Sequence, residues 1–342
     1  MRPFELVRPD TLGKAISYLQ ANPAARLIAG GTNLIDLMKE DVEQPDMLID
    51  VTRLAMADIT VMQDGGLRIG ALVRNTDLAY HPDVMARWPL VSAALLAGAS
   101  PQLRNMATTA GNLLQRTRCY YFYDTAAACN KRTPGQGCAA MNGHNRIHAI
   151  LGTSDQCIAT HPSDLCVALA ALEAVVVAQG PSGERRIAFA DFHRLPGDSP
   201  ERDTVLQHGE IITAVELAPS AYAAHSDYLK LRDRRSYAFA LVSVAAGLEI
   251  SDGLIVSARI ALGGVAHKPW RDSQAEQALV GKAPDAGAFS AAASILLRGA
   301  VPRRDNTFKI GLSQRSIVEA LTRAAEAPSR SLPPELAHRP LT

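Results

Sequence analysis

Residues Arg104–Cys166 read RNMATTAGNLLQRTRCYYFYDTAAACNKRTPGQGCAAMNGHNRIHAILGTSDQCIATHPSDLC. This stretch holds every cysteine of the chain, and the remaining residues contain none. Such clustering is not expected by chance, and it indicates either disulfides or a metal centre. The five residues are Cys119, Cys129, Cys138, Cys157 and Cys166.

A disulfide framework is the weaker interpretation. Disulfide-rich folds are typical of short secreted chains, whereas this chain has 342 residues and an odd number of cysteines. No Cys-x-x-Cys pair occurs, so the spacings of zinc ribbons and ferredoxins match poorly. The spacing alone therefore leaves two alternatives, a four-thiolate site for an unidentified metal or a set of unligated cysteines.

The residues around the cysteines favour the metal site. The loop Cys129–Cys138 is rich in Gly, Pro, Asn, Lys and Arg and cannot bury an apolar face, so a bound metal would explain an ordered loop. Lys131 and Arg132 would offset the negative charge of four thiolates. Cys166 lies instead in the apolar helical run LCVALAALEA, which predicts a buried thiol that binds no metal.

Composition narrows the class of protein. Apolar residues make up 47% of the chain, charged residues 20%, and the formal net charge is +1. This is an ordinary globular composition for two or three domains, and it argues against a polyanion-binding surface. Aromatic residues are only 5% and are not interleaved with basic ones, so nucleic-acid binding is not expected.

The termini and the apolar runs bear on targeting. No run approaches the roughly 18 apolar residues of a membrane span, so membrane insertion is not expected. The first residues, MRPFELVRPD, lack the apolar core of a signal peptide, and we expect no export signal in this chain itself. The proline-rich residues 327–342 are expected to form a loosely held tail.

The first fifty residues predict a small parallel β-α-β unit. A helix is expected at Thr11–Ala21 and buried strands at Leu27–Ala29 and Met47–Val51. Between the strands lie the turn Gly30–Asn33 and a helix at Leu34–Met38. A strand, glycine turn and helix can present backbone N–H groups to a phosphate. The turn matches neither the dinucleotide fingerprint nor Walker A, so a turn without a ligand remains the alternative.

From about Leu54 the pattern changes to hairpins and short helices, which indicates an α+β fold. A second boundary is expected near Pro219–Asp227, and a helix or turn at Tyr237–Leu241 should lead into another strand. Further strands are expected at Ile59–Met62, Leu67–Leu72, Val175–Ala178, Glu184–Ile187, Ile211–Leu217 and Leu254–Leu262. Helices are expected at Thr76–Ala79, Val91–Leu96, Leu165–Ala171, Asp272–Val280, Ala288–Leu297 and Gln314–Ala325.

Three separated segments together resemble a known family. They are LIAGGTNL (Leu27–Leu34), TTAGNLL (Thr108–Leu114) and PSDLCVALAAL (Pro162–Leu172), and they are similar to the FAD-binding subunit of the molybdenum hydroxylase (xanthine dehydrogenase) family. YLKLRDRRSYAFALVSVAA (Tyr228–Ala246) and ALGGVAHKPW (Ala261–Trp270) resemble that family's carboxy-terminal domain. The resemblance extends from residue 1 to about residue 325.

The resemblance implies an α+β architecture. A two-subdomain FAD-binding domain would occupy residues 1–220, with a small β-α-β unit in 1–53 and a mixed or antiparallel sheet in 54–220. A CO dehydrogenase flavoprotein-type domain, α+β with an antiparallel sheet and helices, would follow at 221–326, before the tail at 327–342.

The segment Gln115–Thr160 is an insertion relative to most members. It resembles the [4Fe–4S]-bearing loop of a subgroup that contains the periplasmic aldehyde oxidoreductases and, more distantly, the 4-hydroxybenzoyl-CoA reductases. The motifs RCYYFYD, CNKR and ATHPSDL are particularly similar. Ligation by thiolates alone suits an iron–sulfur cluster. The resemblance thus implies a [4Fe–4S] cluster on Cys119, Cys129, Cys138 and Cys157.

The resemblance also implies flavin contacts. The pyrophosphate turn would comprise Arg26, Leu27, Ile28, Ala29, Gly30, Gly31, Thr32, Asn33 and Leu34, with backbone N–H groups of Ala29–Asn33 facing the diphosphate. A second strip of contacts would come from Thr108, Gly111 and Asn112. Ala110 departs from the family's commoner Gly-Gly-Asn, at little expected cost.

The remaining contacts would involve the flavin's hydroxyls and ring. Ser163 and Asp164 would bind ribityl or adenosine hydroxyls, although either residue could simply cap the following helix. Lys230 would lie near the isoalloxazine, where a cation favours the reduced, anionic flavin. Tyr237 would lie near the ring or, alternatively, in the core.

The implied function is that of an electron-transfer subunit in a heterotrimeric molybdenum enzyme that oxidises aldehydes to carboxylic acids. Nothing in the chain is expected to bind molybdenum, and the plant-type [2Fe–2S] spacing is absent. The expected partners are therefore a large molybdenum-cofactor subunit, a small [2Fe–2S] subunit and an external electron acceptor. No catalytic residue is expected here, since the substrate chemistry belongs to the large subunit.

The sequence leaves other functions open. The chain could be the β subunit of a 4-hydroxybenzoyl-CoA reductase-like enzyme or a self-contained FAD oxidase. An oxidase would need acid–base residues, and the nearest candidates, His144, His148 and His161, are expected to be solvated. A structural or zinc-binding protein is a third class. The [4Fe–4S] cluster could carry electrons or order its loop. The expected location is the periplasm, by co-export with a partner subunit, with the cytoplasm as the alternative.

Overall fold

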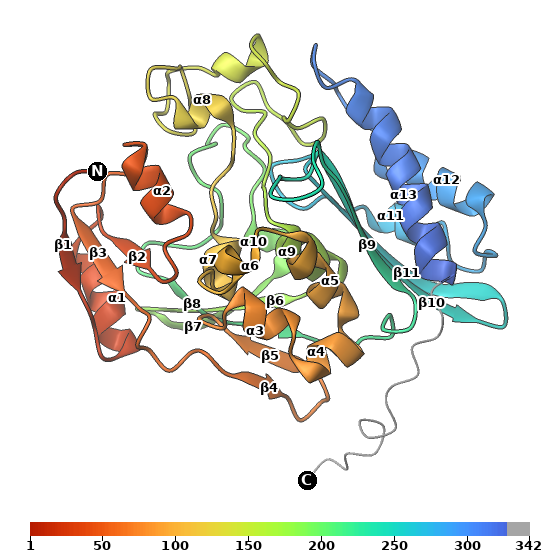
Figure 1. Cartoon of the computed structure of the whole chain (residues 1–342), viewed down its shortest axis with the longest axis horizontal. Helices are drawn as coiled ribbons and strands as arrows, with labels where there is room; N and C mark the ends of the chain where they lie inside the picture. The colour runs from red at the N-terminus through yellow and green to blue at the C-terminus, as the bar shows by residue number, and fades with distance from the viewer. Residues whose placement is uncertain (327–342) are drawn as a thin grey trace.

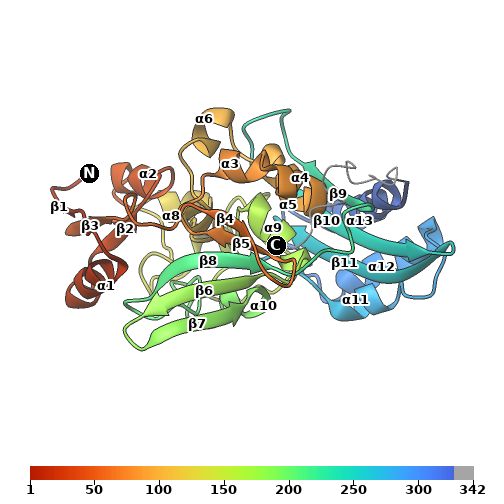
Figure 2. The same cartoon turned by 90° about the horizontal axis from the view of Figure 1, so that it is seen from below.

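Three β-sheets follow one another across the molecule, and each organises one part of the chain (Figures 1 and 2). The computed structural model describes residues 1–326, so the tail expected at 327–342 lies outside the described residues. The α+β architecture expected from the sequence is confirmed. No helix among residues 1–326 is both long enough and apolar enough to cross a membrane.

The first sheet is small and parallel, with strand order β1-β3-β2. The predicted β-α-β unit is confirmed by β2 (Arg26–Ile28), α2 (Leu34–Lys39) and β3 (Met47–Asp50). Helix α1 (Leu12–Ala21) begins after Thr11, whose hydroxyl accepts a hydrogen bond from the Lys14 N–H. Strand β1 (Glu5–Val7) was not predicted, because it is only three residues long and mostly exposed.

The second sheet is antiparallel, with strand order β4-β5-β8-β6-β7. Its strands are β4 (Ile59–Val61), β5 (Leu67–Gly70), β6 (Val175–Gly180), β7 (Gly183–Ala188) and β8 (Ile211–Leu217). Its helices are α3 (Asn75–Ala79), α4 (Pro82–Arg87), α5 (Pro89–Ala97), α6 (Pro101–Arg104), α7 (Thr109–Leu113), α9 (Asp164–Ala171) and α10 (Phe189–Phe192). Every residue of α9 is buried, so this helix lies in the middle of the protein.

The insertion between α7 and α9 has little regular structure. It contains α8 (Tyr120–Tyr123) and a 3₁₀ turn at Ala139–Met141, and an isolated antiparallel bridge pairs Cys129 with Cys138. Its end is fastened to the carboxy-terminal domain, because the N–H groups of Ile150 and Leu151 both donate to the carbonyl of Val265. In Figure 1 the insertion extends away from the central sheet.

The third sheet is antiparallel, in the order β11-β10-β9, and helices pack on it. Its elements are β9 (Ser226–Leu231), β10 (Val242–Ser251), β11 (Leu254–Gly263), α11 (Ser273–Gln277), α12 (Ala286–Leu296) and α13 (Phe308–Glu326). Helix α9 contacts β10, and so does α13, and the first seven residues of β10 are all buried. Burial of both faces removes the polar alternation that identifies a strand, so the start of β10 was hard to predict.

Candidate functional site

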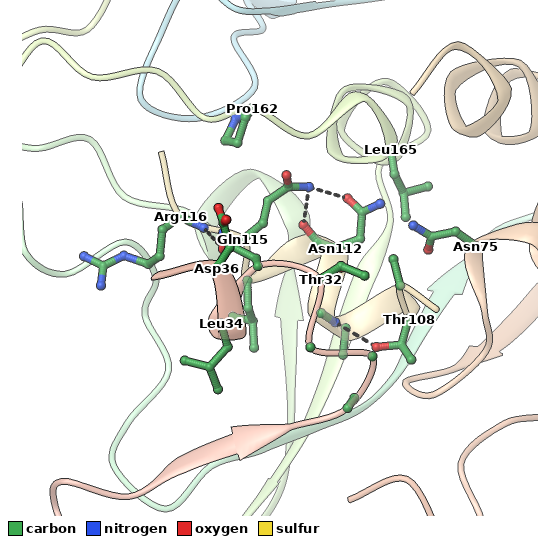
Figure 3. A pocket seen from close by; sticks show the side chains of 18 of the residues that line it. Thr32, Leu34, Asp36, Asn75, Thr108, Asn112, Gln115, Arg116, Pro162 and Leu165 are labelled. Carbon is green, nitrogen blue, oxygen red and sulfur yellow. Dashed lines mark hydrogen bonds between the residues drawn. The ribbon is translucent and has the colours of Figure 1, made fainter. Parts of the chain in front are cut away.

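A cleft of about 1280 Å³ runs between the first two sheets, the insertion and β9. This volume exceeds the roughly 300–1,000 Å³ of most small-molecule sites, so the cleft can accommodate a large ligand. Figure 3 shows the glycine turn before α2 facing Thr108 and Asn112 across it. Of the predicted flavin contacts, these line the cleft: Arg26, Leu27, Ile28, Ala29, Gly30, Gly31, Thr32, Asn33, Leu34, Thr108, Gly111, Asn112, Asp164, Lys230 and Tyr237.

The two glycines of the turn are needed for different reasons. A Cβ atom on Gly30 would lie 1.9 Å from the carbonyl oxygen of Met106, so the turn passes directly against the backbone before α7. Gly31 has φ +69°, a left-handed conformation that glycine adopts without strain. Packing and backbone conformation together therefore hold the turn against the Thr108 segment.

The turn also carries hydrogen-bond donors without partners. In the described chain, the backbone N–H groups of Ala29 through Asn33 donate no hydrogen bond to another backbone group or to a side chain. The side-chain amide nitrogen of Asn33 is buried and likewise without a partner among residues 1–326, while its amide oxygen accepts from the Arg116 N–H at 2.8 Å. Successive free donors facing a cleft form a binding surface for an anion.

The opposite wall is built around α7. Thr108 caps this helix, its hydroxyl accepting from the Gly111 N–H at 3.3 Å. The Asn112 side-chain oxygen accepts from the Gln115 amide at 2.9 Å and from the Ser163 hydroxyl. Ser163 does not line the cleft, because its hydroxyl caps α9 by accepting from the Cys166 N–H at 3.0 Å. Ser163 thus holds Asn112 in place, and its direct contact with flavin stays a prediction.

Asp164 and Lys230 meet at the inner end of the cleft. Lys230 Nζ lies 2.7 Å from Asp164 Oδ2, and the Tyr228 hydroxyl donates to Asp164 Oδ1 at 2.7 Å. Lys230 also donates to the carbonyl of Ala97 at 3.2 Å. Burial and the neighbouring Asp164 carboxylate raise the pKa of Tyr228 well above its usual value, so Tyr228 stays a donor. Both Asp164 oxygens are thus already engaged within the protein.

Tyr237 lies at the exposed rim of the cleft. Its side chain is 59% exposed, so the alternative that placed it in the core is wrong. Its φ of +52° is uncommon for a bulky residue, and the Arg234 guanidinium donates to its carbonyl at 2.9 Å. Nearby, Arg118 lies over the ring of Phe239 at 4.9 Å. This rim presents aromatic surface beside the buried Lys230.

Sequence reasoning missed several residues of the cleft. Asn75 is 3% exposed, and its side-chain oxygen has no partner in the described part of the chain. Arg116 binds Glu43 at 2.6 Å and Asp203 at 2.6 Å. The basic pair in Gln115-Arg-Thr-Arg-Cys, between two cofactor motifs, was a readable signal for Arg116 and Arg118, whereas nothing local marked Asn75.

The four cysteines predicted as ligands meet in one apolar nest beside the cleft. Cys119, Cys129, Cys138 and Cys157 all line the same small cavity. Phe122, Ala140, Ile158 and Ala159 complete its core. No three of the four sulfurs lie within 4.8 Å of one another among the described residues. Four cysteines from one insertion therefore converge on one small cavity.

The nest is lined with donors that suit thiolates. Backbone N–H groups of Tyr121 and Phe122 point to the sulfur of Cys119, and the Ala159 N–H donates to Cys157 Sγ at 3.4 Å. Burial raises the pKa of Cys119 to about 12 and that of Cys157 to about 11. These two thiols would thus stay protonated at neutral pH, whereas a bound metal deprotonates its thiol ligands.

Burial raises the pKa of Cys157 and the charge of Lys131 opposes that rise, so one of the two predicted counter-charges acts directly on a thiol. Lys131 is 3% exposed, and its ammonium donates to the Pro200 carbonyl at 2.7 Å and to Asp203. Burial alone would raise the pKa of Asp203, but Lys131 and Arg116 hold it well below its usual range. Arg132 instead donates to backbone carbonyls at the start of the insertion. Asp203 therefore contacts Lys131 on the side of the cysteine nest and Arg116 on the side of the cleft, and so connects the two sites.

The histidines named as acid–base candidates lie in three different settings. The side chain of His144 is 87% exposed, as expected. His148 is 1% exposed, with Nε2 3.1 Å from Cys119 Sγ, so the prediction that it is solvated is wrong. His161 is half-buried, and its ligand atom lies within 4.8 Å of those of His193 and Cys166. Cys166 itself is fully buried in α9, as predicted.

Comparisons with known proteins agree with this arrangement. The family described as "FAD binding domain in molybdopterin dehydrogenase" matches residues 2–220, and the family described as "CO dehydrogenase flavoprotein C-terminal domain" matches residues 227–326. The aldehyde oxidoreductase FAD-binding subunit PaoB of Escherichia coli is 53% identical, covering 95% of this chain and 99% of that protein.

More distant relatives also match most of the chain. The glyceraldehyde dehydrogenase medium chain of Sulfolobus acidocaldarius is 28% identical and covers 82% of each chain. A solved structure of carbon monoxide dehydrogenase from Hydrogenophaga pseudoflava superposes with a TM-score of 0.75 at 27% identity, covering 96% of this chain and 100% of that one.

Proposed function

The chain belongs to the xanthine dehydrogenase (molybdenum hydroxylase) family as an FAD-binding subunit, and we propose that it serves an aldehyde oxidoreductase. It is a subunit of an oxidoreductase, with the substrate chemistry on a partner chain. The identity to the PaoB subunit over nearly the whole of both chains supports an aldehyde as the substrate of the complex.

The donors of the glycine turn carry the flavin part of the proposal. Five consecutive backbone N–H groups, from Ala29 to Asn33, have no acceptor among the described residues, and the buried amide of Asn33 also lacks one. A dianionic diphosphate would satisfy them, as anions do at such turns. Thr108, Gly111 and Asn112 form the facing wall, and Lys230 at the inner end would place a cation near the flavin ring.

The cysteine nest supports a [4Fe–4S] cluster as a second cofactor. Four sulfurs bound to one zinc ion at 2.3 Å would be about 3.8 Å apart. The sulfurs here are more widely spaced than that, since no three lie within 4.8 Å in the described chain. An iron–sulfur cluster separates its cysteine ligands further than a single ion does. We therefore assign Cys119, Cys129, Cys138 and Cys157 as its ligands.

The proposed complex has three kinds of subunit. Bound FAD would supply electron exchange between a small [2Fe–2S] subunit and an external acceptor, while a large molybdenum-cofactor subunit oxidises the aldehyde. The residues of this chain hold and orient the flavin and keep its inner end dry. We also propose a periplasmic location by co-export with a partner subunit, on the strength of the resemblance of the insertion to that of the periplasmic enzymes.

The test is an anaerobic visible spectrum of the purified chain, with assays for iron, acid-labile sulfide and zinc before and after acid precipitation. We expect flavin that is released by acid, a broad shoulder at about 400 nm and about four irons per chain. Flavin that stays with the precipitate would indicate a covalent flavin oxidase instead. Zinc without flavin would indicate a structural protein, and either result would overturn the proposal.

A further inference from the structure

We propose that His148 donates a hydrogen bond from Nε2 to the sulfur of Cys119 and thereby raises the reduction potential of the cluster. The inference rests on the [4Fe–4S] centre proposed above. It assigns to a residue of this chain a role in setting how readily that centre accepts an electron.

The geometry is that of a hydrogen bond made away from water. His148 Nε2 lies 3.1 Å from Cys119 Sγ, and the two residues are 1% and 7% exposed. Among residues 1–326, His148 is the only side chain that is hydrogen-bonded to one of the four proposed ligand sulfurs. The ring also packs near Tyr121, with ring centroids 6.3 Å apart. Water therefore cannot replace this donor.

The direction of the bond follows from the chemistry of the ligand. A sulfur bound to iron carries no proton and can only accept, so the proton must be on Nε2. The other neutral tautomer would set the Nε2 lone pair against those of the sulfur. It would also leave an N–H at Nδ1, an atom that is buried and without a partner among residues 1–326. The Nε2–H tautomer avoids both costs.

The backbone of His148 is fixed by the carboxy-terminal domain. Its carbonyl accepts from Lys309 Nζ at 3.0 Å and from the Asn306 side-chain amide at 3.2 Å. Its N–H donates to the Asn145 carbonyl at 3.1 Å. Lys309 lies in the first turn of α13 and Asn306 just before that helix, so the start of the last helix positions a donor on the cluster side of the insertion. A group that is held in this way and hydrogen-bonds a ligand of a metal centre tunes that centre.

Loss of the donor has a defined consequence. Hydrogen bonds to ligating sulfurs stabilise the more negative, reduced cluster and so raise its potential. His148→Leu should make the potential more negative, and His148→Gln, which can still present an N–H, should return it toward the wild-type value. His144→Leu, a change at the exposed histidine of the same insertion, should leave the potential unchanged.

The experiment is a redox titration of the full chain followed by electron paramagnetic resonance, with iron, sulfide and flavin measured for every variant. A more negative potential in His148→Leu, with recovery in His148→Gln, supports the inference. Equal potentials in loaded wild type, His148→Leu and His148→Gln overturn it and leave the proposed function intact. A wild-type chain without an iron–sulfur cluster overturns the proposed function and the inference with it.

A second measurement uses wild-type protein alone, in case His148→Leu does not retain its cluster. In chain labelled with ¹⁵N-histidine, pulsed resonance of the reduced cluster should show weak coupling to one histidine nitrogen. Absence of that coupling in a chain that holds the cluster overturns the inference.

Discussion

Lys230 Nζ lies 2.7 Å from Asp164 Oδ2, and this ion pair joins strand β9 of the carboxy-terminal domain to helix α9 of the preceding domain inside the cleft. The side chains are 4% and 9% exposed, so neither charge is solvated. The pair therefore links the relative position of the two domains to the shape of the cleft.

Lys230→Met should destabilise the chain strongly. The change leaves the Asp164 carboxylate buried with only the Tyr228 hydroxyl, and an uncompensated buried charge costs about 3–5 kcal/mol. Urea unfolding of the isolated chain measures this loss. Lys14→Met, which breaks an exposed pair with Asp10, is the control and should change stability little. Equal midpoints for the two variants would show that the buried pair is not needed.

Gly30→Ala should abolish tight FAD binding. The added methyl group would lie 1.9 Å from the Met106 carbonyl oxygen, so the turn must move away from the Thr108 wall. Gly13→Ala is a matched control in α1, where a Cβ meets nothing within 4 Å and should add up to about 1 kcal/mol of stability. Flavin content after gel filtration reports the outcome. Normal flavin content in Gly30→Ala would contradict the placement of the turn.

Substitution of a proposed ligand cysteine should remove iron from the chain, whereas substitution of Cys166 should not. Cys129→Ser removes a proposed ligand and should lower iron from about four per chain to well below one, because an incomplete ligand set holds the cluster poorly. Cys166→Ser changes a thiol that is fully buried in α9 and should leave the iron in place. Iron and sulfide assays on both variants measure this difference. If Cys166→Ser lost its iron while Cys129→Ser kept it, the assignment of Cys129 as a ligand and of Cys166 as an unligated thiol would be wrong.

Lys309 should make stability depend on pH. Burial lowers its pKa from 10.5 to about 7, so between these values the unfolded chain binds a proton that the native chain does not. The free energy of unfolding should therefore rise with pH across this window, by on the order of 5 kcal/mol from this group, and the penalty should be constant below about pH 7.

Lys309→Met removes the titrating group and provides the comparison. The difference in unfolding free energy, wild type minus variant, should increase from pH 7 to pH 10 and be flat below pH 7. Taking the difference cancels the titration of the cysteines, which are present in both chains. A difference that is constant over the whole range would show that Lys309 enters the folded chain without a change in its pKa.

Local patterns predicted much of the fold. Helix α1 followed from the periodic apolar residues of Thr11–Ala21, and the β4–β5 hairpin followed from Gly65-Gly66 between two apolar runs. These elements are decided by residues near one another in the chain, which is why periodicity reveals them. Strand β10 was only partly predicted, because burial between α9 and α13 is a property of the assembled domain.

The candidate site, like the fold, was predictable only where local sequence patterns decide it. The sequence alone singled out the Gly30–Gly31 turn, the Thr108–Asn112 segment and the clustered cysteines, because these residues form unusual local patterns. Only the tertiary structure paired Lys230 with Asp164 and brought His148 to Cys119. Such contacts join residues distant in the chain, and burial, which no local pattern encodes, determines their strength.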